Sequence, residues 1–305
     1  MQHLDLIALR YFSEAVETGS IRQAADRMHV TPSAVSRRIG KLEHQLETVL
    51  FERRASGVVP TAAGEILAAE INAVYNQLSR VQELIGDLDG QRRGNVALYC
   101  MEGAVEGWMS EVVEQYRRRY PRIRFHLHVS STDQSVEALI SGECDIAIMF
   151  KAPRREELTT ITYGCEPLVA LVSPNHPLAK EQVVSLADIF QHDMTMPDMR
   201  FGIRQLVEHQ ARLMGESVPL AVTTNSIAMT RSLVRKGGLT TILPYLSARH
   251  DCELGLLKAL TITEPDDLRA EIELCVRKGR PMTASVRGML SALEDSFERF
   301  VGTCG

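Results

Sequence analysis

The sequence predicts a mainly α-helical domain of the winged helix-turn-helix class, followed by an α/β region of two subdomains. Two short helical patterns joined by a tight turn over residues 20–46 indicate the first class. From residue 95 onward apolar strands alternate with helices, which is typical of sheets covered by helices on both faces. A long helix with regularly spaced apolar residues lies between the two regions. We therefore place the domain limits at 1–60, 61–90 and 91–305.

The composition is that of an ordinary globular chain. Its 305 residues are 45% hydrophobic, which is enough for two or three cores. No window approaches ~18 uninterrupted apolar residues, so we expect no membrane span. The first residues lack the layout of a secretory signal, so we expect a cytoplasmic protein. The cysteines form no CxxC pair and are expected to be reduced thiols that pack as small apolar residues. They are Cys100, Cys144, Cys165, Cys252, Cys275 and Cys304.

Residues 20–46 carry start signals for two helices, after a first helix predicted over 4–18. Ser20 can cap the earlier of the two, and Gln23 completes a capping-box pattern. Thr31 can cap the later one, with Pro32 at the first position, where its missing amide proton costs nothing. Apolar residues at steps of three and four face the interior, namely Val35, Ile39, Leu42 and Leu46.

The opposite face of the later helix offers hydroxyl and basic side chains. In a DNA major groove, arginine can grip guanine, and hydroxyls can reach bases or phosphates. Residues 20–56 hold seven Lys or Arg against four Asp or Glu, a local charge of +3 in a protein of net charge −5. We therefore expect binding to double-stranded DNA, held more firmly by two such modules than by one.

Residues 49–60 predict a small β-hairpin with a break at 54–57. Such a wing can lay Arg53 or Arg54 along the minor groove or a phosphate; the alternative is that both arginines are solvated turn residues. The residues that we expect to contact DNA are Ser20, Arg22, Thr31, Pro32, Ser33, Ser36, Arg37, Arg38, Lys41, Arg53 and Arg54.

Thr61 begins a long helix whose apolar residues recur at alternating steps of four and three. A single helix cannot bury such a seam, so the pattern predicts pairing with a second copy of the chain. The alternative is an amphipathic helix packed on its own domain. At ~1.5 Å per residue the helix spans ~40 Å. The predicted dimer seam consists of Leu67, Ile71, Val74, Leu78, Val81, Ile85 and Leu88.

The first 65 residues contain several motifs in one order and at one set of spacings. They are the pair Ala24-Ala25, residues 33–37, Leu42-Glu43, residues 50–53, and Thr61 with residues 63–65. This set resembles the N-terminal domain of LysR-type transcriptional regulators. Members of that family often carry a base-reading glutamine where this chain has Pro32. Direct readout would then depend more on Ser33, Ser36 and Arg37.

The α/β region is expected to contain a mainly parallel sheet in two units, with the chain crossing between them near Met149 and returning near Leu243. The predicted strands are 96–100, 123–129, 144–149, 168–172, 219–223, 239–243 and 272–277. The predicted helices are 105–120, 133–140, 201–214, 227–236 and 284–300. With Tyr120-Pro121, residues 142–147 and residues 176–178, the region resembles the periplasmic-binding-protein-like effector domain of the same family.

A ligand of such a sheet lies beyond the carboxyl ends of the strands, near helix N-termini. Hydroxyls at 130–132 and Arg200 suit a carboxylate, and Glu102 suits an amine, so we expect an amino or carboxylic acid as effector. The alternative is that Thr132 is a plain helix cap and Glu102 a solvated acid. The expected effector-binding residues are Met101, Glu102, Gly103, Ser130, Ser131, Thr132, Met149, Arg200, Phe201, Gly202 and Asn225.

The sequence lacks a catalytic motif, so we predict no enzyme, no cofactor and no metal site. His126 and His128 share one face of a strand, but no acid or cysteine stands at a ligand spacing, so a structural pair is expected. A nucleophile elbow, a phosphate loop and HExxH are absent. The alternatives are a solute-binding protein and an enzyme with a DNA-binding head. The resemblance implies a homodimer or homotetramer that binds a promoter or operator, with RNA polymerase as a further partner.

Overall fold

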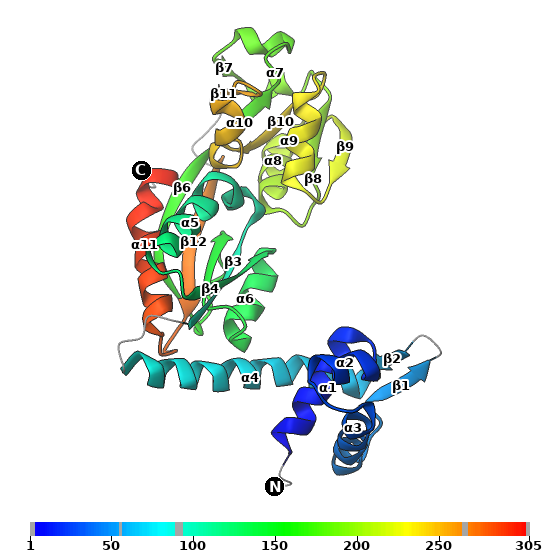
Figure 1. Ribbon diagram of the computed structural model, residues 1–305. Helices are drawn as coiled ribbons and strands as arrows, with labels where there is room; N and C mark the ends of the chain where they lie inside the picture. Colours follow the sequence, from blue (N-terminus) through cyan, green and yellow to red (C-terminus); the bar gives the residue numbers. More distant parts are fainter. Residues whose placement is uncertain (1–3, 55–56, 89–93, 264–267, 303–305) are drawn as a thin grey trace. The chain divides into compact units, whose positions relative to one another are not determined.

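The chain forms two compact units, residues 1–82 and residues 83–305. The structure is a computed structural model, and it describes residues 4–54, 57–88, 94–263 and 268–302 (Figure 1). Each unit is described by itself. In these ranges no helix is both long and apolar enough to cross a bilayer.

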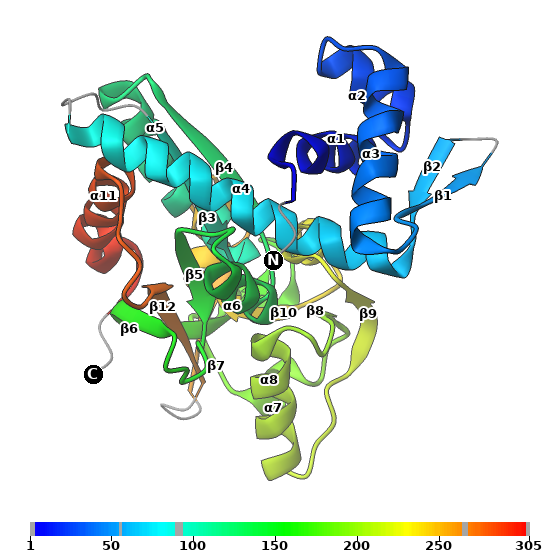
Figure 2. The ribbon, with the colours of Figure 1, turned by 90° about the horizontal axis from the view of Figure 1, so that it is seen from below.

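The N-terminal unit begins with three short helices and a two-stranded wing. These elements are α1 (Leu6–Thr18), α2 (Ile21–Arg27), α3 (Pro32–Leu46), β1 (Phe51–Arg54) and β2 (Gly57–Pro60). Ser20 and Thr31 accept hydrogen bonds from backbone amides of the helices that they precede, as predicted. Phe12, Val35 and Leu42 are fully buried where the three helices meet. The wing lies beside α3 (Figure 2). Its two strands are antiparallel to each other, with Phe51 opposite Pro60.

Helix α4 (Ala62–Leu88) starts where the wing ends. Gly64 in its first turn has no room for a side chain, because a Cβ there would lie 2.2 Å from the carbonyl oxygen of Leu50. Ile71 is only 3% exposed and packs into the core of the N-terminal unit, and the Tyr75 hydroxyl donates to the carbonyl oxygen of Leu6. The first part of α4 is therefore a structural member of this unit.

The second unit contains the remaining strands. They are β3 (Gly94–Cys100), β4 (Ile123–Val129), β5 (Ile146–Phe150), β6 (Leu158–Val172), β7 (Val183–Val184), β8 (Met194–Pro197), β9 (Leu220–Thr224), β10 (Thr241–Pro244), β11 (Lys258–Ile262) and β12 (Arg269–Arg277). Eight of them form one sheet in the order β4-β3-β5-β12-β6-β11-β7, with β10 paired to β6. Strands β8 and β9 form a separate parallel pair.

Helices cover both faces of this sheet. They are α5 (Ser110–Arg119), α6 (Thr132–Ser141), α7 (Leu186–Ile189), α8 (Gly202–Leu213), α9 (Ile227–Arg235), α10 (Arg249–Glu253) and α11 (Ala284–Phe300), with short turns η1 (Glu102–Ala104), η2 (Val105–Met109), η3 (Pro177–Lys180) and η4 (Tyr245–Ser247). In the first subdomain α5 and α11 enclose one core around Trp108, and α6 covers a second core on the other face. In the second subdomain α7, α8 and α9 contribute to a third core.

The prediction of a mainly parallel sheet is wrong at its centre. Strands β6 and β12 are long and antiparallel to each other, and they run through both subdomains (Figure 1). The chain therefore crosses on β6 and returns on β12, not near Met149 and Leu243. The predicted helix 105–120 is also broken, because Glu106 has an extended backbone and Gly107 has a φ of 88°.

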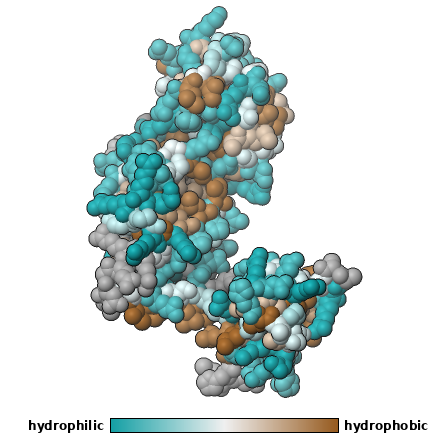
Figure 3. All heavy atoms as spheres, viewed as in Figure 1, coloured by the Kyte–Doolittle hydropathy of each residue, from teal (hydrophilic) through white to brown (hydrophobic). Residues whose placement is uncertain are grey.

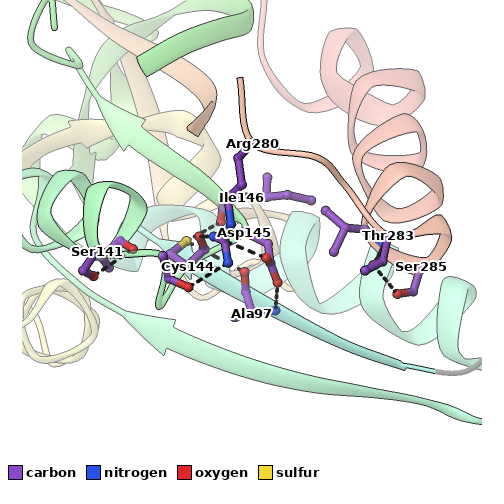
Figure 4. Close-up of polar contacts among 11 residues, drawn as sticks. Ala97, Ser141, Cys144, Asp145, Ile146, Arg280, Thr283 and Ser285 are labelled. Carbon is purple, nitrogen blue, oxygen red and sulfur yellow. Dashed lines mark hydrogen bonds and ion pairs between the residues drawn. The ribbon is translucent and has the colours of Figure 1, made fainter. Parts of the chain in front are cut away.

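The predicted motif at 142–147 has a structural role in the first subdomain. Arg280 donates to the carbonyl oxygens of Gly142 (2.9 Å) and Cys144 (2.8 Å) and lies 3.6 Å from the carboxylate of Asp145 (Figure 4). Asp145 in turn accepts from the amide of Ala97 at 3.0 Å. These bonds fix the end of α6 against β3 and so hold the loop from which β5 begins.

Candidate DNA-binding surface and effector pocket

The exposed face of α3 presents most of the predicted DNA-contacting side chains. Ser33, Arg37 and Lys41 are exposed along it, and within the described residues no ion pair involves Arg37 or Lys41. Arg53 of the wing reaches this face, because its guanidinium lies 3.4 Å from Oγ of Ser36. A free arginine on an exposed helix, supported by a second arginine from a wing, is suited to reading base edges and holding phosphate.

Four other predicted DNA contacts are already engaged within the N-terminal unit. Arg38 is half-exposed and forms an ion pair with Asp5, which caps α1. Arg54 pairs with Glu52 at 2.9 Å. The hydroxyls of Ser20 and Thr31 cap their helices, and that of Thr31 also lies 3.1 Å from the Ser33 hydroxyl. These ion pairs could not be predicted from the sequence, because each depends on which side chains the fold brings together.

A pocket of about 380 Å³ lies between the two subdomains of the second unit. Every predicted effector residue lines it except Met149. The lining also includes residues that the sequence did not indicate, namely Val129, Gln134, Phe150, Ile203, Ile227, Pro244 and Ser247. The prediction that Met149 contacts the effector is corrected. Side chains alternate along β5, so Met149 is buried in the core under α6, and the next residue, Phe150, lines the pocket.

Three helix N-termini lie at the pocket, and those of α6 and α8 have first-turn amides without an acceptor in the described residues. Ser131 caps α6 in a reciprocal capping box with Gln134. Phe201 precedes α8 and provides no side-chain cap, and no acceptor is found in the described ranges for the amides of Gly202 and Ile203. A Cβ at Gly202 would lie 2.2 Å from the Phe150 ring, so a side chain there would require this ring to move. Unpaired amides at a helix start favour a bound anion.

The hydroxyls predicted to bind the effector are partly occupied. Thr132 donates to the carbonyl oxygen of Phe150 at 2.9 Å, and the hydroxyls of Ser130 and Ser135 lie 2.8 Å apart. Arg200 is exposed and pairs with Asp198 at 2.6 Å. These contacts position the rim of the pocket, and both Ser130 and Arg200 line it.

Ser247 is one of the lining residues that the sequence did not indicate. It follows β10 in the turn η4 and is 4% exposed, and its hydroxyl has no hydrogen-bond partner in the described structure. A Cβ added at Gly103 would lie 2.7 Å from its Oγ, so a side chain there would cover it. A buried hydroxyl without a partner costs free energy, which a polar ligand in the pocket would recover.

Family comparison identifies both of the domains that contain these surfaces. Residues 6–65 match the model of the bacterial regulatory helix-turn-helix protein, lysR family, and residues 89–298 match the LysR substrate binding domain. The chain belongs to the LysR family of transcriptional regulators. It is a DNA-binding regulator whose second unit is a two-lobed effector-binding domain, so the predicted fold class and family are confirmed.

Relatives and solved structures of the LysR family share this organisation. The RuBisCO operon transcriptional regulator of Allochromatium vinosum is 27% identical over 281 residues, which cover 92% of each chain. The structure of full-length CbnR with its target DNA has a TM-score of 0.75 at 19% identity and covers 96% of this chain and 99% of that one. The effector-binding domain of QuiR in complex with shikimate has a TM-score of 0.58 at 20% identity and covers 68% of this chain and 100% of that one.

A partly buried ion cluster joins the two lobes of this LysR-type regulator. Arg231 on α9 lies 2.6 Å from the carboxylate of Glu106 in η2 and 3.1 Å from that of Asp251 in α10. Arg235 adds a second contact to Asp251 at 3.2 Å. Glu106 belongs to the first subdomain and the other three residues to the second, so this cluster is a direct contact between the lobes.

One histidine of the predicted structural pair has an aromatic neighbour. His128 stacks on Tyr99 with ring centroids 4.6 Å apart. No group of three metal-ligating side chains occurs among the residues that the structure describes.

The cysteines differ from the prediction at one position. Cys165 is disulfide-bonded, which corrects the expectation that all six are reduced thiols. Four other cysteines are free, namely Cys100, Cys144, Cys252 and Cys275, and Cys304 lies outside the described residues. Burial raises the pKa of the thiols of Cys100 and Cys275 to about 11.

We expect Cys100 and Cys275 to resist alkylation in the native protein. At pH 8, far below a pKa of about 11, almost none of either thiol is present as the reactive thiolate. Iodoacetamide labelling followed by peptide mass spectrometry should leave both unmodified in the folded chain and modify both in denaturant. Rapid native labelling of Cys100 would show that its burial is not maintained in solution.

Proposed function

We propose that α3 reads the operator of this regulator through Ser33, Ser36 and Arg37, with Arg53 of the wing adding a phosphate or minor-groove contact. The observation that carries this proposal is the exposed Arg37, which has no ion pair among the described residues, on a face bordered by hydroxyls. Arg38 and Arg54 contribute mainly to the fold, because acids of the same unit engage them. Arg22, Pro32 and Lys41 are exposed and belong to the same proposed set of DNA contacts.

Arg37→Ala is expected to lower the preference for operator over random DNA by about ten- to a hundredfold, because a bidentate arginine contact contributes roughly 1–3 kcal/mol of discrimination. Competition gel shifts on both DNAs would measure this preference. Arg27→Ala is the matched control, since Arg27 is equally basic and exposed but pairs with Glu14 and Glu17 away from α3. Equal losses on operator and random DNA would assign Arg37 to phosphate contact instead.

We infer that the effector is a small molecule with a carboxylate, as in the expected classes of amino and carboxylic acids. The uncapped start of α8, the start of α6 and the buried hydroxyl of Ser247 converge on one pocket, and together they suit an anionic group beside a hydrogen-bonding group. The likeness to the QuiR domain, whose structure contains shikimate, supports a ligand in this pocket.

Calorimetry of the full chain against a panel of carboxylic and amino acids should detect a ligand whose affinity falls about tenfold in Ser247→Ala, the usual scale for one hydrogen bond to a buried group. Ser141→Ala is the matched control, because Ser141 lies at the far end of α6 and its hydroxyl bonds to Ala138 (Figure 4). Thr132→Ala tests the predicted hydroxyl cluster. An unchanged affinity in both pocket variants would place the ligand elsewhere.

We propose that the protein acts as a homodimer or homotetramer joined through α4, without enzymatic activity, in the bacterial cytoplasm. The limits 1–60, 61–90 and 91–305 would then separate DNA binding, dimerisation and effector binding. A ligand that closes the lobes would change how the subunits associate and so the spacing of the paired α3 helices. RNA polymerase would be the further partner at the promoter.

A further inference from the structure

We propose that Glu102 restricts the effector pocket to ligands with a single carboxylate. Its side chain lines the pocket, and its own carboxylate already occupies one of the helix N-termini at the boundary between the lobes. This inference rests on the proposed function, a small carboxylate effector, and adds which carboxylates the pocket admits.

Three helices of nine or more residues begin at the pocket, and one of these helix starts is taken. Oε1 of Glu102 accepts a hydrogen bond of 2.9 Å from the Ser226 hydroxyl and another of 2.9 Å from the amide of Ala228, in the first turn of α9. Glu102 thus fills the position at which a carboxylate of a ligand would be stabilised by the amides and dipole of α9. The acid comes from η1 of the first subdomain, so it also bridges the lobes.

The other two helix starts can still receive an anion. The amides of Gly202 and Ile203 in α8, and those of Thr132 and Asp133 in α6, have no acceptor in the described part of the chain. An independent observation points to a ligand in the same space, because the buried Ser247 hydroxyl faces the pocket without a partner. One carboxylate at α6 and α8 and one neutral hydrogen-bonding group at Ser247 would satisfy these groups.

A second carboxylate on the ligand would meet the negative charge of Glu102. Like charges within a few ångströms in a partly enclosed pocket repel strongly, and the third helix start at this boundary, that of α9, is already neutralised by Glu102. We therefore expect a dicarboxylate to bind at least about tenfold more weakly than the monocarboxylate from which it differs by that one group.

The test uses three matched pairs of probes on the full chain, namely lactate and malate, butyrate and glutarate, and benzoate and phthalate. Calorimetry should detect binding of at least one monocarboxylate. The affinity for its dicarboxylate partner should be lower by at least about tenfold. Glu102→Gln keeps an oxygen acceptor for Ser226 and Ala228 but removes the charge, so in this variant the loss should shrink to less than about threefold. Glu137→Gln is the matched control, because Glu137 is exposed on α6 and does not line the pocket.

The outcomes separate this inference from the proposed function. If a dicarboxylate binds the native chain as tightly as its monocarboxylate, or if Glu102→Gln leaves the ratio unchanged, the role of Glu102 is overturned and a carboxylate pocket remains. If no member of any pair binds the native chain, the carboxylate class fails and this inference fails with it. Circular dichroism of both variants would establish that each is folded, and Glu102→Ala provides a second uncharged variant.

Discussion

Leu78→Glu is expected to leave the chain folded but monomeric at micromolar concentration, and to weaken operator binding by about a hundredfold. The apolar residues in the later part of α4 face solvent within one chain: Val74, Leu78, Val81 and Ile85 are 45%, 43%, 48% and 59% exposed. Figure 3 shows apolar surface over this helix. A glutamate in a paired seam would be buried without a partner, and a monomer loses the bivalent hold on two half-sites, which contributes roughly 10²–10⁴ in affinity.

Light scattering after size-exclusion chromatography would give the mass, and gel shifts the affinity. Ile66→Glu is the matched control, because Ile66 lies on α4, is 68% exposed and is outside the repeat of the seam. A dimer of unchanged mass in Leu78→Glu would mean that the subunits associate through another surface. A monomer in both variants would mean that any acid on α4 disrupts the assembly.

The heptad pattern predicted α4 well but did not show which of its residues a partner must cover. Ile71 is buried by its own N-terminal unit, so its place in the predicted dimer seam is corrected, and Leu67 is partly covered by the same core. The side chain of Leu88 lies outside the described part of the structure. Periodicity identifies an apolar stripe, but the same stripe can pack within a chain and between chains.

Local signals predicted the helices more accurately than the sheet. Helix starts are defined to within a few residues by Ser20, by Thr31 and by the apolar residues that follow each of them. The helices of the N-terminal unit could therefore be predicted from the sequence. The first two thirds of β6, residues 158–167, are rich in threonine and were not predicted as a strand, because their pairing partner β12 lies more than one hundred residues later in the chain. Without that pairing the alternation of strands and helices suggested a parallel sheet.

The pocket was predictable where it consists of strand ends and helix starts, and only there. Residues 101–103 and 130–132 meet because they follow β3 and β4, which are parallel neighbours in one sheet, and residues 200–202 follow β8 of the separate parallel pair. Ser247 follows β10 in a short turn and carries no such signal. The contacts of Glu102 with Ser226 and of Arg231 with Glu106 join distant segments of different lobes, so they emerge only from the folded chain.

Arg231→Met is expected to lower the free energy of unfolding by about 3 kcal/mol, because removing one partner of a buried ion pair leaves the other charge uncompensated. Arg231 and Asp251 are both buried, and Asp251 would retain only the half-exposed Arg235. Urea or guanidinium unfolding of the full chain measures the change. Arg235→Met is the matched control on the same carboxylate, and its greater exposure should limit the loss to about 1 kcal/mol.

The ion pair between Arg231 and Glu106 predicts that stability depends on pH in a definite direction. The hydrogen bond from Arg231 holds the pKa of the Glu106 carboxyl below its usual value. A carboxyl with a lowered pKa in the folded state contributes stability above its unfolded pKa of about 4.3, and this contribution is lost as the pH falls through the lower, folded value. The native chain should therefore lose stability below about pH 4.3 more steeply than Arg231→Met, so the difference between them narrows in acid. Because Glu106 is half-exposed, its contribution to the free energy of unfolding is small. If the difference in this free energy between the native chain and Arg231→Met stays constant from pH 7 to pH 3, Arg231 stabilises the lobes by packing alone.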